Sequence, residues 1–282
     1  MELMKGQMKG LKRNTTDKFY TSKKCVDLCM EFISKYIEIK PTSLIIEPSA
    51  GNGAFIKSIK LLDATSVFYD LDQEHPEIIQ KDYLTINQKE YSSYYNKEDY
   101  ETIHIIGNPP FGRQSSTAIK FIKKSCEFCD TLSFILPKSF KKDSLQKHFP
   151  LNFHLIYQVD LPANSFIVNG EEYDVPCVFQ IWIKNETERT TSVKLLPLGF
   201  VFVTKENKPD ISFRRVGVNA GVIDTIIENK STQSHYFIKF TNSKTAAENI
   251  IALKFINYDF NNTVGPKSIS KQELIKEFIK VL

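Results

Sequence analysis

Short apolar runs alternate with amphipathic segments from about residue 22 to residue 185. The run TLSFILP (131–137) is apolar almost throughout, which is typical of a strand covered on both faces. Residues 22–37 instead place apolar side chains at helical spacing. Strands that alternate with helices form a mostly parallel sheet with right-handed crossovers, so we predict an α/β fold of this kind. The expected strands are residues 43–47, 66–70, 104–107, 131–137, 153–162 and 175–183.

The pattern changes after about residue 190, where strand-like pieces mix with short helices. Ser270 and Glu273 form a possible capping box at the start of the last helix. We therefore predict three parts: a flexible basic arm (1–18), an α/β domain (19–190) and a small α+β region (191–282). We expect the third part to pack on the core and to serve target recognition or an accessory role, and it could equally be an extension of the same domain.

The composition is that of a globular protein, with 41% hydrophobic and 25% charged residues in 282. No apolar run reaches the ~18 residues of a membrane-span candidate. The first residues lack the apolar stretch of a signal peptide, so we expect an intracellular protein, cytoplasmic or nuclear, without membrane association.

Five cysteines and the absence of a secretory signal favour reduced thiols. Cys126 and Cys129 have zinc-like spacing, and Cys25 and Cys29 could add two ligands. Both pairs fall in predicted helices, however, where cysteine commonly serves as a small core residue. We therefore predict no metal site.

The net charge of +4 permits a polyanionic partner. Each basic cluster alone is typical of a solvated face, but several clusters in one chain favour nucleic acid. One of them pairs Arg214 with Arg215. The other two contain Lys5, Lys9, Lys12, Arg13 and Lys18, and Lys138, Lys141, Lys142, Lys147 and His148.

The stretch EPSAGNGAF (47–55) joins an expected strand to a helix. Gly51 and Gly53 permit positive φ and a close backbone approach, at the end of a parallel strand where ligands bind. A dinucleotide fingerprint would need a third glycine where Ile56 stands. Because Glu47 is acidic, the turn suits a cationic or hydroxyl-bearing ligand better than a diphosphate.

Two further acidic residues follow later strand ends. Asp70, in FYDLD, lies where ribose hydroxyls are bound in this architecture. Asp82, in QKDYL, could accept a hydrogen bond from an adenine amino group. Strand-end acids are often only caps, but three in successive turns fit an adenosine ligand without phosphates.

These stretches, followed by NPPFG (108–112), resemble class I S-adenosylmethionine-dependent methyltransferases. Within that family, Asn-Pro-Pro-(Phe/Tyr/Trp) marks enzymes that act on planar amino groups, chiefly N6 of adenine. DKFYTSKK (17–24) resembles the N-terminal motif of the γ-type order, with Ser22 where proline is common. The resemblance covers residues 17–185 and implies a seven-stranded sheet with an antiparallel last strand. It implies cofactor contacts from Tyr20, Thr21, Glu47, Pro48, Ala50, Gly51, Gly53, Asp70, Leu71, Asp82, Tyr83 and Asn108.

The NPPF cluster has a chemical interpretation. An exocyclic adenine amine is a poor nucleophile, and two fixed acceptors can orient it. We assign these to the Asn108 side-chain oxygen and the Pro109 carbonyl, with Pro110 stiffening the loop. Phe111 offers a stacking face for a base flipped out of a duplex. Further substrate contacts are predicted from Arg214 and Arg215, from Arg113, which could equally be a solvated arginine, and from Phe166, for which a place in the core is the alternative.

We therefore predict an S-adenosylmethionine-dependent adenine-N6 methyltransferase acting on nucleic acid, with DNA favoured. RNA, including a cap-proximal mRNA adenosine, is the first alternative. Methylation of protein glutamine and a non-catalytic subunit that keeps the fold are further alternatives, and a protein partner remains open. The sequence contains no nucleophile elbow, Walker A motif or H-E-x-x-H.

Overall fold

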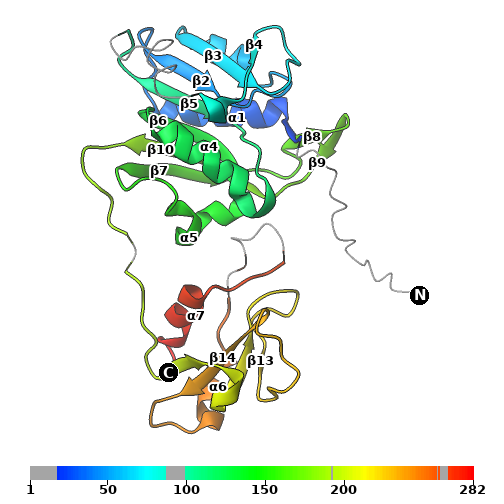
Figure 1. Cartoon of the computed structure of the whole chain (residues 1–282), viewed down its shortest axis with the longest axis vertical. Helices are drawn as coiled ribbons and strands as arrows, with labels where there is room; N and C mark the ends of the chain where they lie inside the picture. Colours follow the sequence, from blue (N-terminus) through cyan, green and yellow to red (C-terminus); the bar gives the residue numbers. More distant parts are fainter. Residues whose placement is uncertain (1–17, 87–98, 192, 259, 261–265) are drawn as a thin grey trace. The chain divides into compact units, whose positions relative to one another are not determined.

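Seven strands form the central sheet in the computed structural model (Figure 1). Their order is β4-β3-β2-β5-β6-β10-β7; β10 pairs antiparallel with both β6 and β7, and the other neighbouring strands pair parallel. The predicted α/β fold with an antiparallel last strand is therefore confirmed. The structure describes residues 18–86, 99–191, 193–258, 260 and 266–282. The strands are β2 (Leu44–Glu47), β3 (Thr65–Asp70), β4 (Ile78–Gln80), β5 (Ile103–Gly107), β6 (Thr131–Pro137), β7 (Phe153–Asp160) and β10 (Cys177–Lys184).

Helices cover both faces of this sheet. Every residue of β5 and β6 is buried, as their apolar sequences predict. The α1 helix packs Val26, Cys29 and Ile33 on one face, and α4 lies on the other (Figure 1). Ser22 caps α1, and its hydroxyl accepts a hydrogen bond from Cys25 N. The helices of this unit are α1 (Lys23–Tyr36), α2 (Ile56–Lys60), α4 (Ser116–Cys126) and the 3₁₀ turns η1 (Tyr83–Thr85) and η2 (Arg113–Ser115).

The strand order reverses at β2. The chain leaves β2 toward β3 on one side and later returns to β5 on the other. In open α/β sheets such a switch point leaves a crevice at the carboxyl ends of the two strands. Glu47 and Gly107, which end β2 and β5, flank this crevice.

A small second sheet lies in the connection that the sequence predicts only as a loop between the last two strands. Asn169 and Gly170 both have positive φ (53° and 82°), which fits a tight hairpin turn. β1 pairs antiparallel with β8, so that residues before the first helix join this hairpin. The strands are β1 (Tyr20–Thr21), β8 (Phe166–Val168) and β9 (Glu171–Tyr173).

The chain divides into two compact units, and the second consists of residues 138–146 together with 190–282. Its core packs Phe200 and Phe213 against Phe278. The predicted capping box is present, because Ser270 and Glu273 bond each other's backbone N–H. The sheet order is β11-β14-β12-β13, from β11 (Phe200–Val203), β12 (Ile211–Arg214), β13 (Ile223–Asp224) and β14 (His235–Phe240). The helices are η3 (Lys138–Lys141), α5 (Asp143–Gln146), η4 (Lys205–Asn207), α6 (Ala246–Leu253) and α7 (Lys271–Phe278).

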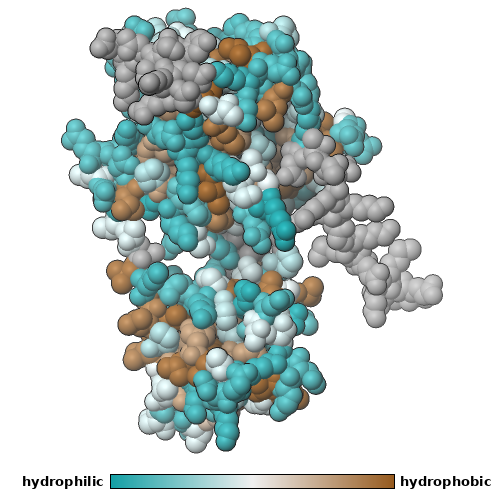
Figure 2. Space-filling model, viewed as in Figure 1, coloured by the Kyte–Doolittle hydropathy of each residue, from teal (hydrophilic) through white to brown (hydrophobic). Residues whose placement is uncertain are grey.

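The second unit also carries many exposed apolar side chains, part of which Figure 2 shows. Leu196 and Phe255 are 80% and 83% exposed. A single exposed apolar side chain is common on a protein surface. Many such side chains gathered together indicate a contact surface. Among the described helices, none is long and apolar enough to span a membrane. All five cysteines are buried and form no disulfide.

Candidate active site

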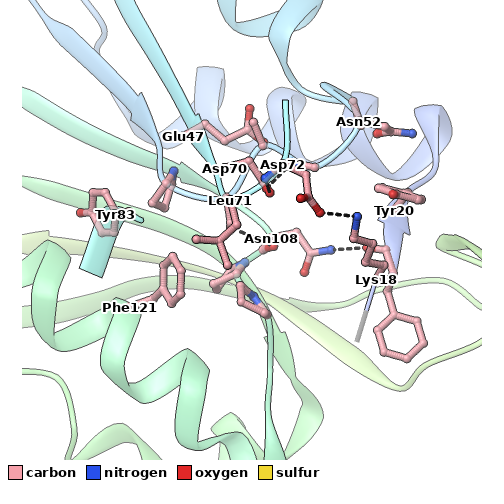
Figure 3. Close-up of a pocket in the computed structure, with 18 of the residues that line it drawn as sticks. Lys18, Tyr20, Glu47, Asn52, Asp70, Leu71, Asp72, Tyr83, Asn108 and Phe121 are labelled. Carbon is pink, nitrogen blue, oxygen red and sulfur yellow. Dashed lines mark hydrogen bonds and ion pairs between the residues drawn. The ribbon is translucent and has the colours of Figure 1, made fainter. Parts of the chain in front are cut away.

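A cavity of about 360 Å³ lies at the carboxyl ends of β2, β3 and β5 (Figure 3). Tyr83 and Phe121 lie at one end of it, and Lys18 and Tyr20 at the other. The catalytic candidates Asn108, Pro109, Pro110 and Phe111 all contribute to its wall. So do Tyr20, Thr21, Glu47, Pro48, Ala50, Gly51, Asp70, Leu71, Asp82 and Tyr83, which were predicted to bind the cofactor.

The glycine turn after β2 forms one wall. Gly51 has φ of 55°, and its N–H donates a 2.7 Å hydrogen bond to Asp70 Oδ2, so the end of β3 fixes the turn after β2. Gly53 (φ 82°) does not line the cavity. A Cβ at Gly53 would lie only 2.9 Å from Ile56 Cδ1, so this glycine lets the turn pack against its own helix.

Glu47 is a buried carboxyl at the base of the cavity. The residue is 1% exposed, and Oε2 has no hydrogen-bond partner in the part of the chain that the structure describes. Burial, and then the nearby Asp70 charge, raise the pKa of Glu47 well above its usual range. An unpaired buried carboxyl of this kind favours a cationic ligand, whose charge would restore the ionised form.

The other predicted acids differ in their surroundings. Asp82 is exposed, and its carboxylate accepts a 2.9 Å hydrogen bond from Leu84 N at the start of η1. Leu71 is 65% exposed at the cavity wall, whereas Tyr83 is buried and stacks on Phe121 with ring centroids 5.7 Å apart. The cavity thus combines carboxylates with flat apolar surface.

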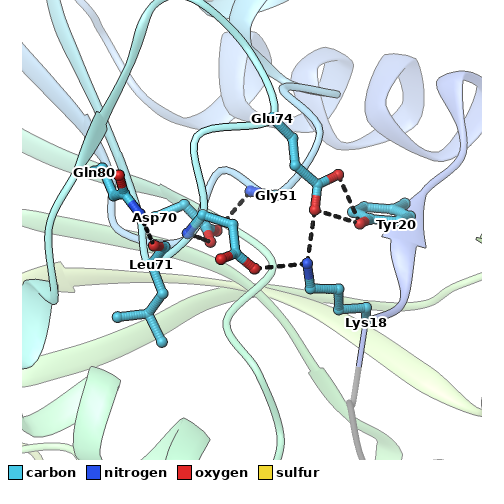
Figure 4. A network of polar contacts seen from close by, with 8 residues as sticks. Lys18, Tyr20, Gly51, Asp70, Leu71, Glu74 and Gln80 are labelled. Carbon is cyan, nitrogen blue, oxygen red and sulfur yellow. Dashed lines mark hydrogen bonds and ion pairs between the residues drawn. The ribbon is translucent and has the colours of Figure 1, made fainter.

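Lys18 and Glu74 form a polar latch that the sequence analysis missed (Figure 4). Lys18 Nζ lies 2.8 Å from Asp72 Oδ2 and 2.7 Å from Glu74 Oε1. The Tyr20 hydroxyl donates to the same Glu74 carboxylate at 2.7 Å. These contacts join residues more than fifty positions apart, so no local pattern predicts them. Residues 1–17 of the predicted arm lie outside the described residues.

Asn108 follows directly on β5, and its side chain is held in one orientation. Nδ2 donates to Phe19 O at 3.0 Å and to Thr21 Oγ1 at 3.2 Å. Oδ1 is buried and has no hydrogen-bond partner among the described residues. The Ser49 hydroxyl donates to the Asn108 carbonyl at 3.3 Å. A hydrogen-bond acceptor is therefore held in place at the cavity, and none of the described residues uses it.

Phe111 belongs to an aromatic group that links the NPPF loop to the small sheet. Phe19 stacks on Phe111 (6.5 Å between centroids) and on Tyr173 (5.7 Å). Phe166, predicted to contact the base, is instead fully buried and meets Phe19 edge-on, because β8 turns this side chain into the core. Arg113 is exposed in the turn after Phe111 and does not line the cavity.

The two predicted arginine contacts belong to the second unit. Arg214 Nε donates to the Val216 carbonyl at 2.9 Å, which bends the side chain onto its own turn. The Arg215 guanidinium lies over the Tyr236 ring, 5.6 Å from its centroid. The Arg215 guanidinium also donates a 2.7 Å hydrogen bond to the Gln233 carbonyl. Both arginines are thus bonded to backbone carbonyls, and Arg215 is in addition part of a basic and aromatic group.

No protein-family model and no curated protein matches the sequence. Similar solved structures include a proposed RNA methyltransferase from Pyrococcus horikoshii (15% identity, TM-score 0.43, covering 64% of this chain and 93% of that one). A proposed class I S-adenosylmethionine-dependent methyltransferase from Listeria monocytogenes has 13% identity and a TM-score of 0.44, covering 64% of this chain and 66% of that one. A methyltransferase subunit of a type I restriction-modification system from Streptococcus thermophilus has 15% identity and a TM-score of 0.43, and the match covers 86% of this chain and 54% of that one. Similarity at this level describes the fold and assigns no activity.

Proposed function

We propose that this chain is an S-adenosylmethionine-dependent methyltransferase that acts on the exocyclic amino group of adenine in nucleic acid. One observation carries the proposal: Asn108 Oδ1 is buried, unpaired and held in place where the NPPF loop borders the cavity. An acceptor left unused in a folded protein has a desolvation cost that a ligand donor can relieve.

The residues of the cavity fit the proposed cofactor. Glu47 would face its cationic part, because a buried carboxyl with an unpaired oxygen regains its charge beside a cation. Asp70 and Asp82 would bind hydroxyl and amino groups of the cofactor, and Tyr83 would line the end of the cavity that holds its flat adenine ring. When bound, the cofactor supplies a methyl group on a positively charged sulfur.

The chain's own part in the reaction is to orient the acceptor amine. Asn108 Oδ1 and the Pro109 carbonyl would accept hydrogen bonds from the two amine hydrogens and so direct the nitrogen lone pair away from the ring. Neither group needs to be a strong base, because the proton can leave after the methyl group has been transferred. Rigid placement supplies the rate advantage. For well-oriented groups it lowers the activation barrier by about 7 kcal/mol or more.

The charge distribution supports nucleic acid as the substrate. Residues 138–146 and 190–282, the second unit, contain 16 Lys and Arg against nine Asp and Glu, whereas the rest of the chain is net acidic. Within this unit, Lys271 Nζ lies over the rings of Phe202 (4.7 Å) and Tyr236 (5.9 Å), beside Arg215. Cationic groups interleaved with aromatic rings suit a polyanion that also carries bases.

The test is methyl transfer from labelled S-adenosylmethionine to DNA, uncapped RNA, capped RNA and protein in parallel, followed by nucleoside and amino-acid analysis. We expect N6-methyladenine, with DNA the best acceptor. Label on RNA alone would keep the chemistry and change the substrate. Label on glutamine, or none on any nucleic acid despite cofactor binding, would refute the proposal.

A further inference from the structure

The strand β1 and the two residues before it face two parts of the cavity in alternation. Lys18 and Tyr20 bond the carboxylates of the loop after β3 (Figure 4). Phe19 and Thr21 instead meet the NPPF loop, through the Phe19 ring and carbonyl and the Thr21 hydroxyl. This follows from the period of an extended chain, in which successive side chains point to opposite faces.

Thr21 is a fixed point in this arrangement. It is 7% exposed and pairs with Phe166 in the small sheet. Its neighbour Ser22 donates its backbone N–H to the Ser165 carbonyl at 2.9 Å and caps α1. Strand pairing on one side and a helix cap on the other leave the Thr21 hydroxyl little freedom to move.

Asn108 needs this fixed point because its amide can adopt two flipped orientations. The Phe19 carbonyl can only accept, so it selects the orientation that presents Nδ2 to β1. The Thr21 hydroxyl takes up a second Nδ2 hydrogen bond, at 3.2 Å. With both satisfied, the plane of the amide is set, and Oδ1 is directed away from β1.

We propose that Thr21 is a positioning residue that acts through Asn108, rather than chiefly a cofactor contact. Its hydroxyl holds the Asn108 amide so that Oδ1 is presented to the acceptor amine. The inference rests on the proposed function for its kinetic consequence, and on the geometry of the described residues for its structural part.

The kinetic test compares Thr21→Val with Thr21→Ser and the wild type, using the best acceptor from the substrate panel. Valine keeps the shape of threonine but leaves one partly buried Nδ2 hydrogen unpaired. We expect kcat to fall about tenfold, as the loss of one hydrogen bond of about 1.4 kcal/mol suggests. The KM for the acceptor and the Kd for the cofactor should stay close to the wild-type values, and serine should restore kcat. Thr65→Val, at an exposed threonine that begins β3, is the matched control.

A second readout requires no activity. The side-chain amide signals of Asn108, assigned by their loss in Asn108→Ala, can be followed by ¹H–¹⁵N NMR. We expect them to shift and to exchange faster with solvent in Thr21→Val, but not in Thr21→Ser or Thr65→Val. Unchanged amide signals in Thr21→Val would overturn the inference, as would a loss of cofactor affinity with unchanged kcat. If the wild type methylates no adenine, the proposed function fails and the NMR comparison alone decides the role of Thr21.

Discussion

The Tyr20 hydroxyl donates a 2.7 Å hydrogen bond to the Glu74 carboxylate, and this contact joins β1 to the loop after β3 across one end of the cavity. Lys18 reinforces it, and the two carboxylates beside Lys18 raise the pKa of its amine above the usual range. The latch is therefore ionic and lies largely in contact with solvent.

Lys18→Met should loosen the latch and weaken cofactor binding. Because the ion pairs are solvent-exposed, the change in Kd should be small, at most about fivefold at low salt. High salt should reduce the difference from the wild type, since it screens the wild-type pairs. Titration calorimetry at two salt concentrations measures both effects. Lys23→Met, which removes an exposed pair with Asp27 on α1, is the control. Equal salt dependence in Lys18→Met and the wild type would contradict this prediction.

Glu47 should make stability fall as pH rises. Its pKa in the folded protein is raised above that of the unfolded chain, so the folded protein retains a proton that the unfolded chain has released. The stability that protonated Glu47 contributes is fully present below the ordinary carboxyl pKa and is lost as pH rises toward the raised pKa. Over that window the free energy of unfolding should decrease by up to about 1.4 kcal/mol per pH unit.

Glu47→Gln should remove this part of the pH dependence, because an amide stays neutral. Urea unfolding between pH 4 and pH 8, an interval of roughly the width that a strongly shifted carboxyl spans, provides the measurement. Glu31→Gln, at an exposed position of α1, should retain the wild-type profile. Identical profiles for Glu47→Gln and the wild type would show that Glu47 is ionised in the folded protein.

Asn108→Ala should separate chemistry from cofactor binding. The variant removes the acceptor Oδ1 but leaves the carboxylates and the glycine turn unchanged, so kcat should fall about 100-fold or more. The Kd for the cofactor should change by no more than about threefold, well under the tenfold that 1.4 kcal/mol would produce. Asn185→Ala, at an exposed asparagine after β10, controls for loss of an amide. A collapse of cofactor binding in Asn108→Ala would mean that Asn108 serves the cofactor first.

The parts of the site that the sequence predicts are those encoded within a few residues. EPSAGNGAF must form a turn after a buried strand, and NPPF follows another, so parallel pairing brings Glu47 and Asn108 to the same crevice. The latch between Lys18 and Glu74 has no such local signal. The predicted position of Phe166 lacked a local signal too. Whether its ring points into the cavity or into the core depends on how β8 pairs, and β8 pairs with β1.

The Asn-Gly pair at 169–170 is a hairpin signal that was present in the sequence and was not used. Its recognition would have predicted β8 and β9. It would not have predicted β1, whose two residues pair with β8 from more than 140 positions away. Short strands of this kind depend on the tertiary fold rather than on their own sequence.

Arg215→Ala should lower the affinity for nucleic acid and its salt dependence. Each lost phosphate contact reduces the slope of log K against log salt by about one. Lys271→Ala should act similarly, because Lys271 and Arg215 both lie over the Tyr236 ring. Arg214→Ala should have a smaller effect, because the Arg214 side chain is bonded to the Val216 carbonyl of its own turn rather than placed over this ring. Fluorescence anisotropy with single-stranded DNA and RNA over a range of salt concentrations gives the slopes. Lys280→Ala is the control, since Lys280 is already paired with Glu277. An unchanged slope in both Arg215→Ala and Lys271→Ala would place the nucleic-acid contacts elsewhere.

Gly112→Ala should impair catalysis through the NPPF loop, and Gly170→Ala provides a control at another glycine with positive φ. Both glycines have positive φ, 67° and 82°. A Cβ at Gly112 would collide with the Thr117 side chain, whereas a Cβ at Gly170 would meet open space. Gly112 has ψ of 177°, a combination with positive φ that is essentially confined to glycine, so its alanine should cost about 1–3 kcal/mol of stability. Only Gly112→Ala should also displace Phe111 and lower kcat. Thermal unfolding and methyl-transfer kinetics measure the two effects separately. If both variants lower kcat alike, the loss comes from reduced stability and the loop geometry after Phe111 has no special role.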